Sequence, residues 1–196
     1  MKRNLTTGSI WKNIFYFSLP YLLSYFLQTL YGMADLFIIG QFDGAASTTA
    51  VSIGSQVMHM ITVIIVGLAM GTTVSIAQAV GAKDKKQASR CTGNTITLFL
   101  GVSVVLMVIL LLLVKPIVLV MSTPSEAVSG TVAYLTICFI GIPFITAYNI
   151  ISSIFRGLGD SKSPMYFIAV ACAANITLDY LFMGALHLGP SGAALG

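Results

Sequence analysis

The sequence predicts an all-α membrane protein, a polytopic bundle of five spanning helices followed by the start of a sixth. Charged residues make up 8% of the 196-residue chain, against roughly 25% in ordinary soluble domains. Hydrophobic residues reach 57%, and the mean hydropathy is +0.93. So few charges could not cover a water-soluble domain, so lipid must be the solvent for much of the chain. The long unbroken apolar runs also exclude a β-barrel, whose strands alternate over about 10 residues.

Five segments are apolar over about 20 residues or more, the length that crosses a bilayer as an α-helix. In order they are Ile14–Gly40, Ala50–Val80, Asn94–Val114, Val128–Phe155 and Pro164–Leu186. The first follows basic residues, as a signal peptide does. It is too long for one and has no small-residue cleavage site, so we expect it to be retained. Pro20 in the first span and Pro143 in the fourth remove a backbone donor, which predicts either a hinge or a static kink.

Basic residues set the orientation of these spans. Nine of the ten fall before the first span, between the second and third, or between the fourth and fifth: Lys2, Arg3, Lys12, Lys83, Lys85, Lys86, Arg90, Arg156 and Lys162. Only Lys115 falls on the other side. The positive-inside rule therefore predicts a multi-pass protein of the cell (inner) membrane with a cytoplasmic N-terminus. The pI of about 9.0 reflects this topology, so the lipid bilayer is expected as a partner and nucleic acid is not.

Two carboxylates fall inside predicted spans, whereas the other four acids fall in loops. Asp35 lies five residues before Gly40, about 8 Å inside the outer end of its span at 1.5 Å per residue. Asp179 lies seven residues before Leu186, or about 10 Å inside. A charge at mid-membrane costs at least ~2.5–3.5 kcal/mol, so a carboxylate inside a span is a functional candidate by default.

Two further polar residues are predicted at the same depth. Asn175 lies four residues before Asp179, on the same helix face. Tyr134 lies about six residues past the external start of its span, by the same topology. Together with Asp35 these groups could bind Na⁺ or share protons. Simpler interpretations stay open for each: snorkelling or capping for Asp35, an interfacial aromatic for Tyr134, and a helix-bridging hydrogen bond for Asn175.

The second span is unusually polar for a membrane helix. Gln56 and His59, with Gln28 of the first span, are candidates for lining a cavity, and hydrogen bonds between helices are the alternative. Gly67 and Gly71 form a GxxxG pair, which predicts close helix packing. The three cysteines have no paired spacing, so neither a zinc site nor a disulfide is expected.

Four segments of the chain resemble one family of transporters, in order and at the expected spacing. They are MADLFIIGQFDGAAS in the first span, SIAQAVGAKDKKQA after the second, RGLGDSKSPM after the fourth, and NITLDYLFMGAL followed by GPSGAALG. These segments are similar to multidrug and toxic compound extrusion (MATE) transporters, in the DinF-like branch. The resemblance covers essentially the whole chain.

The resemblance implies an antiporter rather than an enzyme, built from two six-helix lobes and needing no cofactor. Its expected activity is export of small organic solutes, cationic or amphiphilic, driven by inward H⁺ or Na⁺. It implies that Asp35, Asp179, Asn175 and Tyr134 form the cation-coupling site. The only metal it allows is Na⁺, at Asp35, Asn175 and Asp179. It also implies that the first helix bends at Pro20.

The chain stops at Gly196, where the sixth span should begin. Residues 1–196 are therefore expected to be an incomplete N-terminal lobe, with the C-terminal lobe as the missing partner.

Three other functions stay open. Lipid-linked oligosaccharide flippases of the same superfamily line their cavity with basic residues, and here no Lys or Arg is expected inside a span. Gly157–Asp160 fits the GxGD pattern of intramembrane aspartyl proteases, which need two aspartates close together. Asp160, however, is expected across the membrane from Asp35 and Asp179. The third possibility is an inert fragment.

Overall fold

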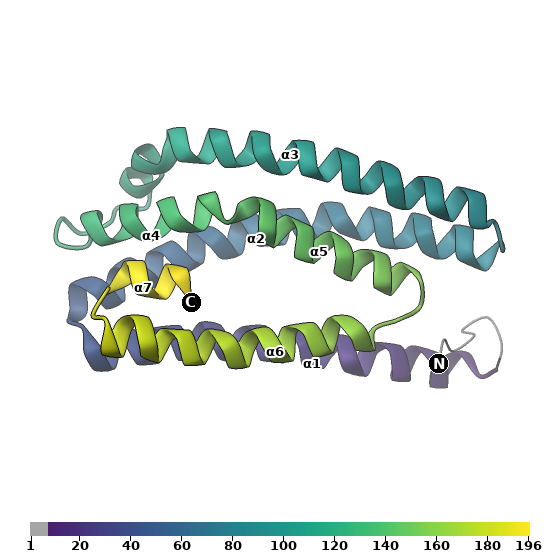
Figure 1. Ribbon diagram of the computed structural model, residues 1–196, viewed down its shortest axis with the longest axis horizontal. Helices are drawn as coiled ribbons and strands as arrows, with labels where there is room; N and C mark the ends of the chain where they lie inside the picture. The colour runs from purple at the N-terminus through teal and green to yellow at the C-terminus, as the bar shows by residue number, and fades with distance from the viewer. Residues whose placement is uncertain (1–7) are drawn as a thin grey trace.

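The computed structural model describes residues 8–196 as a bundle of helices that run along one long axis (Figure 1). In chain order the elements are α1 (Ile10–Phe42), α2 (Ala45–Gly81), α3 (Lys85–Val120), α4 (Val128–Ile140), α5 (Ile142–Gly157), α6 (Lys162–Asp179), the π-helical turn η1 (Tyr180–Ala185) and α7 (Pro190–Leu195). The described residues contain no strand, so the predicted all-α class is confirmed. Lys2 and Arg3, used above for the orientation, lie outside the described residues.

The predicted spans correspond to these helices. Within residues 8–196, four helices are long and apolar enough to cross a membrane, and counting the bent pair α4–α5 as one span gives five. The five-span prediction is therefore confirmed, and α7 begins the sixth. The helices α1, α2 and α3 extend past the predicted limits at both ends. These extensions are more polar, and helical hydrogen bonding continues beyond the apolar stretch.

The two prolines behave differently. Pro143 stands in the first turn of α5, just after Gly141, and α4 and α5 are bent by 50° at this break. In contrast, α1 continues as one helix through the buried Pro20. The Ser24 hydroxyl donates to the Pro20 carbonyl across one turn, at 2.9 Å. A single missing N–H does not interrupt the hydrogen bonds of the turns on either side.

The two ends of the bundle differ in composition. The start of α1, the α2–α3 connection and the α5–α6 connection (158–161) share one end, at the right of Figure 1, which we call the basic end. The start of α4, η1 and α7 share the other end, which we call the packed end. Seven of the described basic residues lie beside the basic end in sequence: Lys12, Lys83, Lys85, Lys86, Arg90, Arg156 and Lys162. The exposed Lys115 lies near the last turns of α3, toward the packed end.

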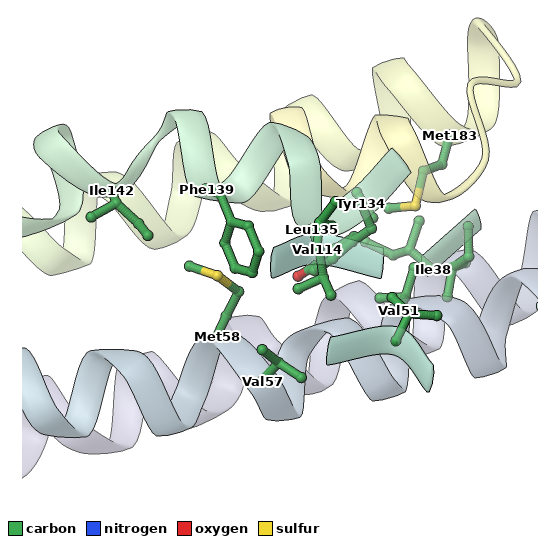
Figure 2. Close-up of a cluster of buried hydrophobic side chains, with 13 residues drawn as sticks. Ile38, Val51, Val57, Met58, Val114, Tyr134, Leu135, Phe139, Ile142 and Met183 are labelled. Carbon is green, nitrogen blue, oxygen red and sulfur yellow. The ribbon is translucent and has the colours of Figure 1, made fainter. Parts of the chain in front are cut away.

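The apolar core gathers toward the packed end. Its cluster draws on α1, α2, α3, α4, α5, η1 and α7, and Figure 2 shows Met58 of α2 facing Phe139 of α4. Most large apolar side chains outside the cluster are exposed around the bundle, as expected of a surface that faces lipid.

Close helix contacts occur at glycines other than the predicted pair. Gly67 and Gly71 are exposed, and within the described residues nothing lies within 4 Å of a Cβ placed at either, so the predicted packing role of this pair is wrong for this lobe. Instead, a Cβ at Gly54 would clash with the Tyr134 ring, and a Cβ at Gly157 would lie 2.9 Å from the Cβ of Ile76. The GxxxG spacing fixes one helix face but does not fix which partner reaches it.

Candidate functional site

The two carboxylates of the spans meet between α1 and α6, which pack along each other. Asp35 is 7% exposed and Asp179 is 0% exposed. The Asp35 carboxyl group lies within hydrogen-bonding reach of the Asp179 carboxyl group and of the Asn175 amide. The structure therefore brings together the three residues that the depth argument had placed in one layer.

This cluster contains more oxygen atoms than hydrogen-bond donors. Within residues 8–196, one oxygen of Asp35, the amide oxygen of Asn175 and both oxygens of Asp179 have no hydrogen-bond partner. An ionised carboxylate only accepts hydrogen bonds, so two of them side by side cannot satisfy one another. A proton shared between them or a hard cation bound by their oxygens would satisfy both, and buried unsatisfied polar atoms are otherwise rare.

Tyr134 joins the same region from α4. Its ring packs on Gly54, and its hydroxyl lies 3.1 Å from the Ser55 hydroxyl, where either group can donate. It is close enough to Asp35 for an electrostatic interaction. At 6% exposure it is a buried residue, so its interpretation as an interfacial aromatic is wrong. Capping is also wrong for Asp35, because α1 runs on to Phe42 and Asp43 occupies the C-cap.

A change of helix type directly follows the acidic pair. Asp179 is the last residue of α6, and the chain then forms the π-helical turn η1 before α7. The backbone of Gly196, just after α7, packs against the Asp179 carboxyl group. Turns of π-helix are rare and often mark functional sites. No sequence signal predicts this turn, because its composition is that of an ordinary apolar helix.

The three residues proposed to line a cavity do not lie together in the structure. Gln28 lines a small polar cavity between α1, α5 and α6, whereas Gln56 and His59 are exposed on α2 and do not line that cavity. Helical spacing predicted the polar face of α2 but not whether a neighbouring helix covers it.

Arg156 is a further functional candidate, which the sequence placed between the fourth and fifth spans. The helix α5 extends to Gly157, so Arg156 lies in its last turn rather than in a loop. Its guanidinium carbon lies 5.2 Å from the centroid of the Tyr21 ring, and the side chain lines the same cavity as Gln28. Arg156 therefore lies just beyond the predicted span, in a helix that continues past the apolar stretch.

Asp160 has a structural role at the basic end. One of its oxygens accepts from the backbone N–H groups of Lys162 and Ser163, at 3.0 and 3.1 Å, and the other accepts from the Ser163 hydroxyl at 2.6 Å. Partial burial acts to raise the pKa of Asp160, but these hydrogen bonds outweigh it and lower the pKa below its usual value. The Asp160 side chain of the GxGD motif thus stabilises the first turn of α6. Asp160 is a capping residue rather than one of a catalytic pair. No group of three or more His, Cys, Asp or Glu side chains among residues 8–196 is arranged to hold a metal ion.

Sequence comparison finds relatives that match most of the chain. A family model, MatE, matches residues 20–181. A probable multidrug resistance protein of Bacillus subtilis, YpnP, is 32% identical over 97% of this chain and 43% of its own length. A probable multidrug resistance protein of Thermotoga maritima, NorM, is 29% identical over 94% of this chain and 40% of its own length.

Solved structures agree with this placement. A MATE crystal structure in the bent conformation matches with a TM-score of 0.90 and 30% identity, over 96% of this chain and 42% of the other. A MOP superfamily transporter from Pyrococcus furiosus, for which reverse polarity of the binding pocket suggests a different function, matches with a TM-score of 0.89 and 30% identity, over 96% and 41%. The chain thus spans about two fifths of the length of these relatives. Because both the family model and the fold cover most of its residues, the chain belongs to the MatE family.

Proposed function

We propose that this chain is the N-terminal lobe of a cation-coupled antiporter that exports organic, cationic or amphiphilic compounds. The single observation that carries the proposal is the buried pair Asp35 and Asp179, which meet on neighbouring helices with unsatisfied oxygens. The names of the relatives, which are multidrug resistance proteins, support export of small compounds over the flippase alternative. Transport itself belongs to the complete transporter, because an alternating-access pathway lies between two lobes.

The chemistry of coupling follows from the charges in the pair. Two ionised carboxylates in hydrogen-bonding reach repel one another strongly in a medium of low dielectric constant. A bound proton or Na⁺ removes this repulsion and lets α1 and α6 pack closely, with the Asn175 oxygen available as a further ligand of Na⁺. Loss of the cation restores the repulsion. Cation binding thus favours one relative position of the two helices, which is the differential interaction that coupling requires.

Pro20 is the proposed hinge of this movement. It lies fifteen residues before Asp35, which is about 22 Å along the helix at 1.5 Å per residue. The turn at Pro20 lacks one backbone hydrogen bond and so bends at lower cost than the rest of α1. The proposed orientation puts the basic end and Pro20 toward the cytoplasm, and the acidic pair in the outer half of the membrane.

The test is efflux from proteoliposomes that contain the full-length protein in which this lobe occurs. We expect Asp35→Asn and Asp179→Asn each to abolish coupled efflux, because neither variant can form the doubly acidic pair. Comparing an imposed pH gradient with an imposed Na⁺ gradient identifies the coupling ion. Glu126→Gln is the matched control, since Glu126 is an exposed acid on the α3–α4 connection, and it should leave efflux unchanged. Full efflux in both aspartate variants would contradict the proposal.

A further inference from the structure

A second polar cluster lies in the other half of the bundle, toward the basic end. It surrounds a cavity of about 20 Å³ between α1, α5 and α6, which the coupling mechanism does not use. Its lining is rich in hydroxyl and amide groups, contributed by Tyr21 and Ser24 of α1 and by Asn149 and Ser152 of α5. Arg156 is the only charged residue of the lining.

The positive charge of Arg156 is incompletely paired. One terminal nitrogen donates to the Ser153 hydroxyl at 3.1 Å, and the guanidinium lies over the Tyr21 ring. Its Nε is buried without a hydrogen-bond partner, and within residues 8–196 the side chain forms no ion pair with a carboxylate. Arg156 as a whole is half-buried, and a cation partly removed from water is stabilised by an anionic partner.

A second unsatisfied group lines the same cavity. The Ser152 hydroxyl is buried and has no hydrogen-bond partner in the described part of the chain. Two other donors of the lining are engaged: Ser24 donates to the Pro20 carbonyl, and Asn149 donates to the Ile145 carbonyl at 2.8 Å. The lining thus includes two hydrogen-bond donors without an acceptor, the cationic Arg156 side chain at Nε and the Ser152 hydroxyl.

We propose that this cavity binds a small inorganic anion, of which chloride is the representative, held by Arg156 and Ser152. A cavity needs about 10–15 Å³ to hold one water, so this one accommodates a single small ion. At about 20 Å³ the cavity is too small for a phosphate that carries a lipid glycerol group. A bound anion would join the last turn of α5 to α1 close to Pro20. Its occupancy therefore stabilises the packing of the N-terminal half of α1 against α5 and α6.

Thermal unfolding of the purified full-length protein in detergent tests this site. Sodium chloride is titrated against sodium gluconate at constant total sodium, so that any effect of Na⁺ at the acidic pair stays fixed. We expect a saturable rise of Tm with chloride and with bromide, because an ion that binds only the folded state stabilises it. We expect Arg156→Gln to abolish this rise, and Ser152→Ala to weaken the apparent chloride affinity about tenfold, as loss of one hydrogen bond to a charged group does. Arg90→Gln, which alters an exposed arginine of α3, is the matched control and should retain the full response.

Anomalous scattering from bromide provides a readout that does not depend on a variant that folds. A bromide peak is expected between Arg156 and Ser152 in crystals grown in bromide. Equal Tm values in chloride and gluconate, or an unchanged chloride response in Ser152→Ala together with no bromide peak, would overturn the proposal and leave a site for water alone. Stabilisation that appears only with added phosphatidylglycerol would also overturn it, in favour of a lipid headgroup. None of these outcomes bears on Asp35 and Asp179, so the coupling proposal stands or fails separately.

Discussion

The packed end and the basic end of this lobe hold charges of opposite sign in different ways. At the packed end, Asp35 and Asp179 lie beside an apolar core to which seven elements contribute. Toward the basic end, Arg156 lies beside a hydroxyl-lined cavity with a tyrosine face as its partner. The difference shows that one bundle can hold both signs of charge away from bulk water, toward opposite ends, with buried polar atoms that lack a hydrogen-bond partner in each cluster.

Side-chain truncation on either side of the α4–α5 break should give the largest contrast. Phe139 is fully buried in the core cluster of α4, whereas Phe144 of α5 is 78% exposed. We expect Phe139→Ala to lower the free energy of unfolding by about 3 kcal/mol, because a cavity replaces packed atoms. Phe144→Ala should change it little, since lipid or detergent replaces the ring. Reversible unfolding in mixed micelles measures both, and equal losses would contradict the burial of Phe139 in the core and the exposure of Phe144 to lipid.

Two glycines of α2 provide the second contrast. A Cβ at Gly54 would clash with the Tyr134 ring, whereas within the described residues a Cβ at Gly67 would meet nothing within 4 Å. Gly54→Ala should therefore destabilise the protein by about 1–3 kcal/mol through overpacking. Gly67→Ala should stabilise it by up to about 1 kcal/mol through helix propensity. The Tm values in one detergent test the signs, and a loss in both variants would indicate that Gly67 is packed in the folded protein.

Removal of the Asp160 cap should have the smallest effect and a defined pH dependence. Asp160→Asn keeps one acceptor oxygen but loses the second oxygen and the charge, so at neutral pH it should cost at most about 1 kcal/mol, the value of a lost N-terminal cap. Because the folded-state pKa of Asp160 is lowered, its stabilising effect is present above the unfolded pKa of about 3.9 and is lost as the pH falls through the folded pKa. The Tm difference between the wild type and Asp160→Asn should therefore narrow below about pH 4.

Asp84 serves as the matched comparison for this cap. It stands at the N-cap of α3 and accepts one hydrogen bond, from the Gln87 N–H at 2.9 Å. Asp84→Asn should have a smaller effect than Asp160→Asn, because Asp160 accepts three hydrogen bonds. A Tm difference for Asp160→Asn that stays constant down to pH 3 would contradict the capping role.

Much of the site could be predicted from the local sequence. The predictions that were wrong concern features that depend on the tertiary structure. The depth of Asp35, Asn175 and Asp179 follows from counting residues to a helix end, and the structure brings these side chains together. Arg156 lies in the last turn of α5 rather than in a loop, because the helix continues past the apolar stretch. The packing role of the Gly67–Gly71 pair was wrong because, within the described residues, nothing lies opposite that face of α2. An apolar stretch marks where lipid begins but not where a helix ends, and a polar stripe does not show which helix covers it.

The sequence by itself determined the number of spans, the segregation of basic residues to one end, and the depth of the two buried carboxylates. These properties depend on local hydrophobicity and on the constant rise of an α-helix. Only the tertiary structure decided that Asp35 meets Asp179, that Arg156 turns into a cavity, and that a π-helical turn follows the acidic pair. The physical reason is that lipid is as apolar as a protein core. Apolar residues on both faces of a helix leave little pattern in the sequence to show which face is buried.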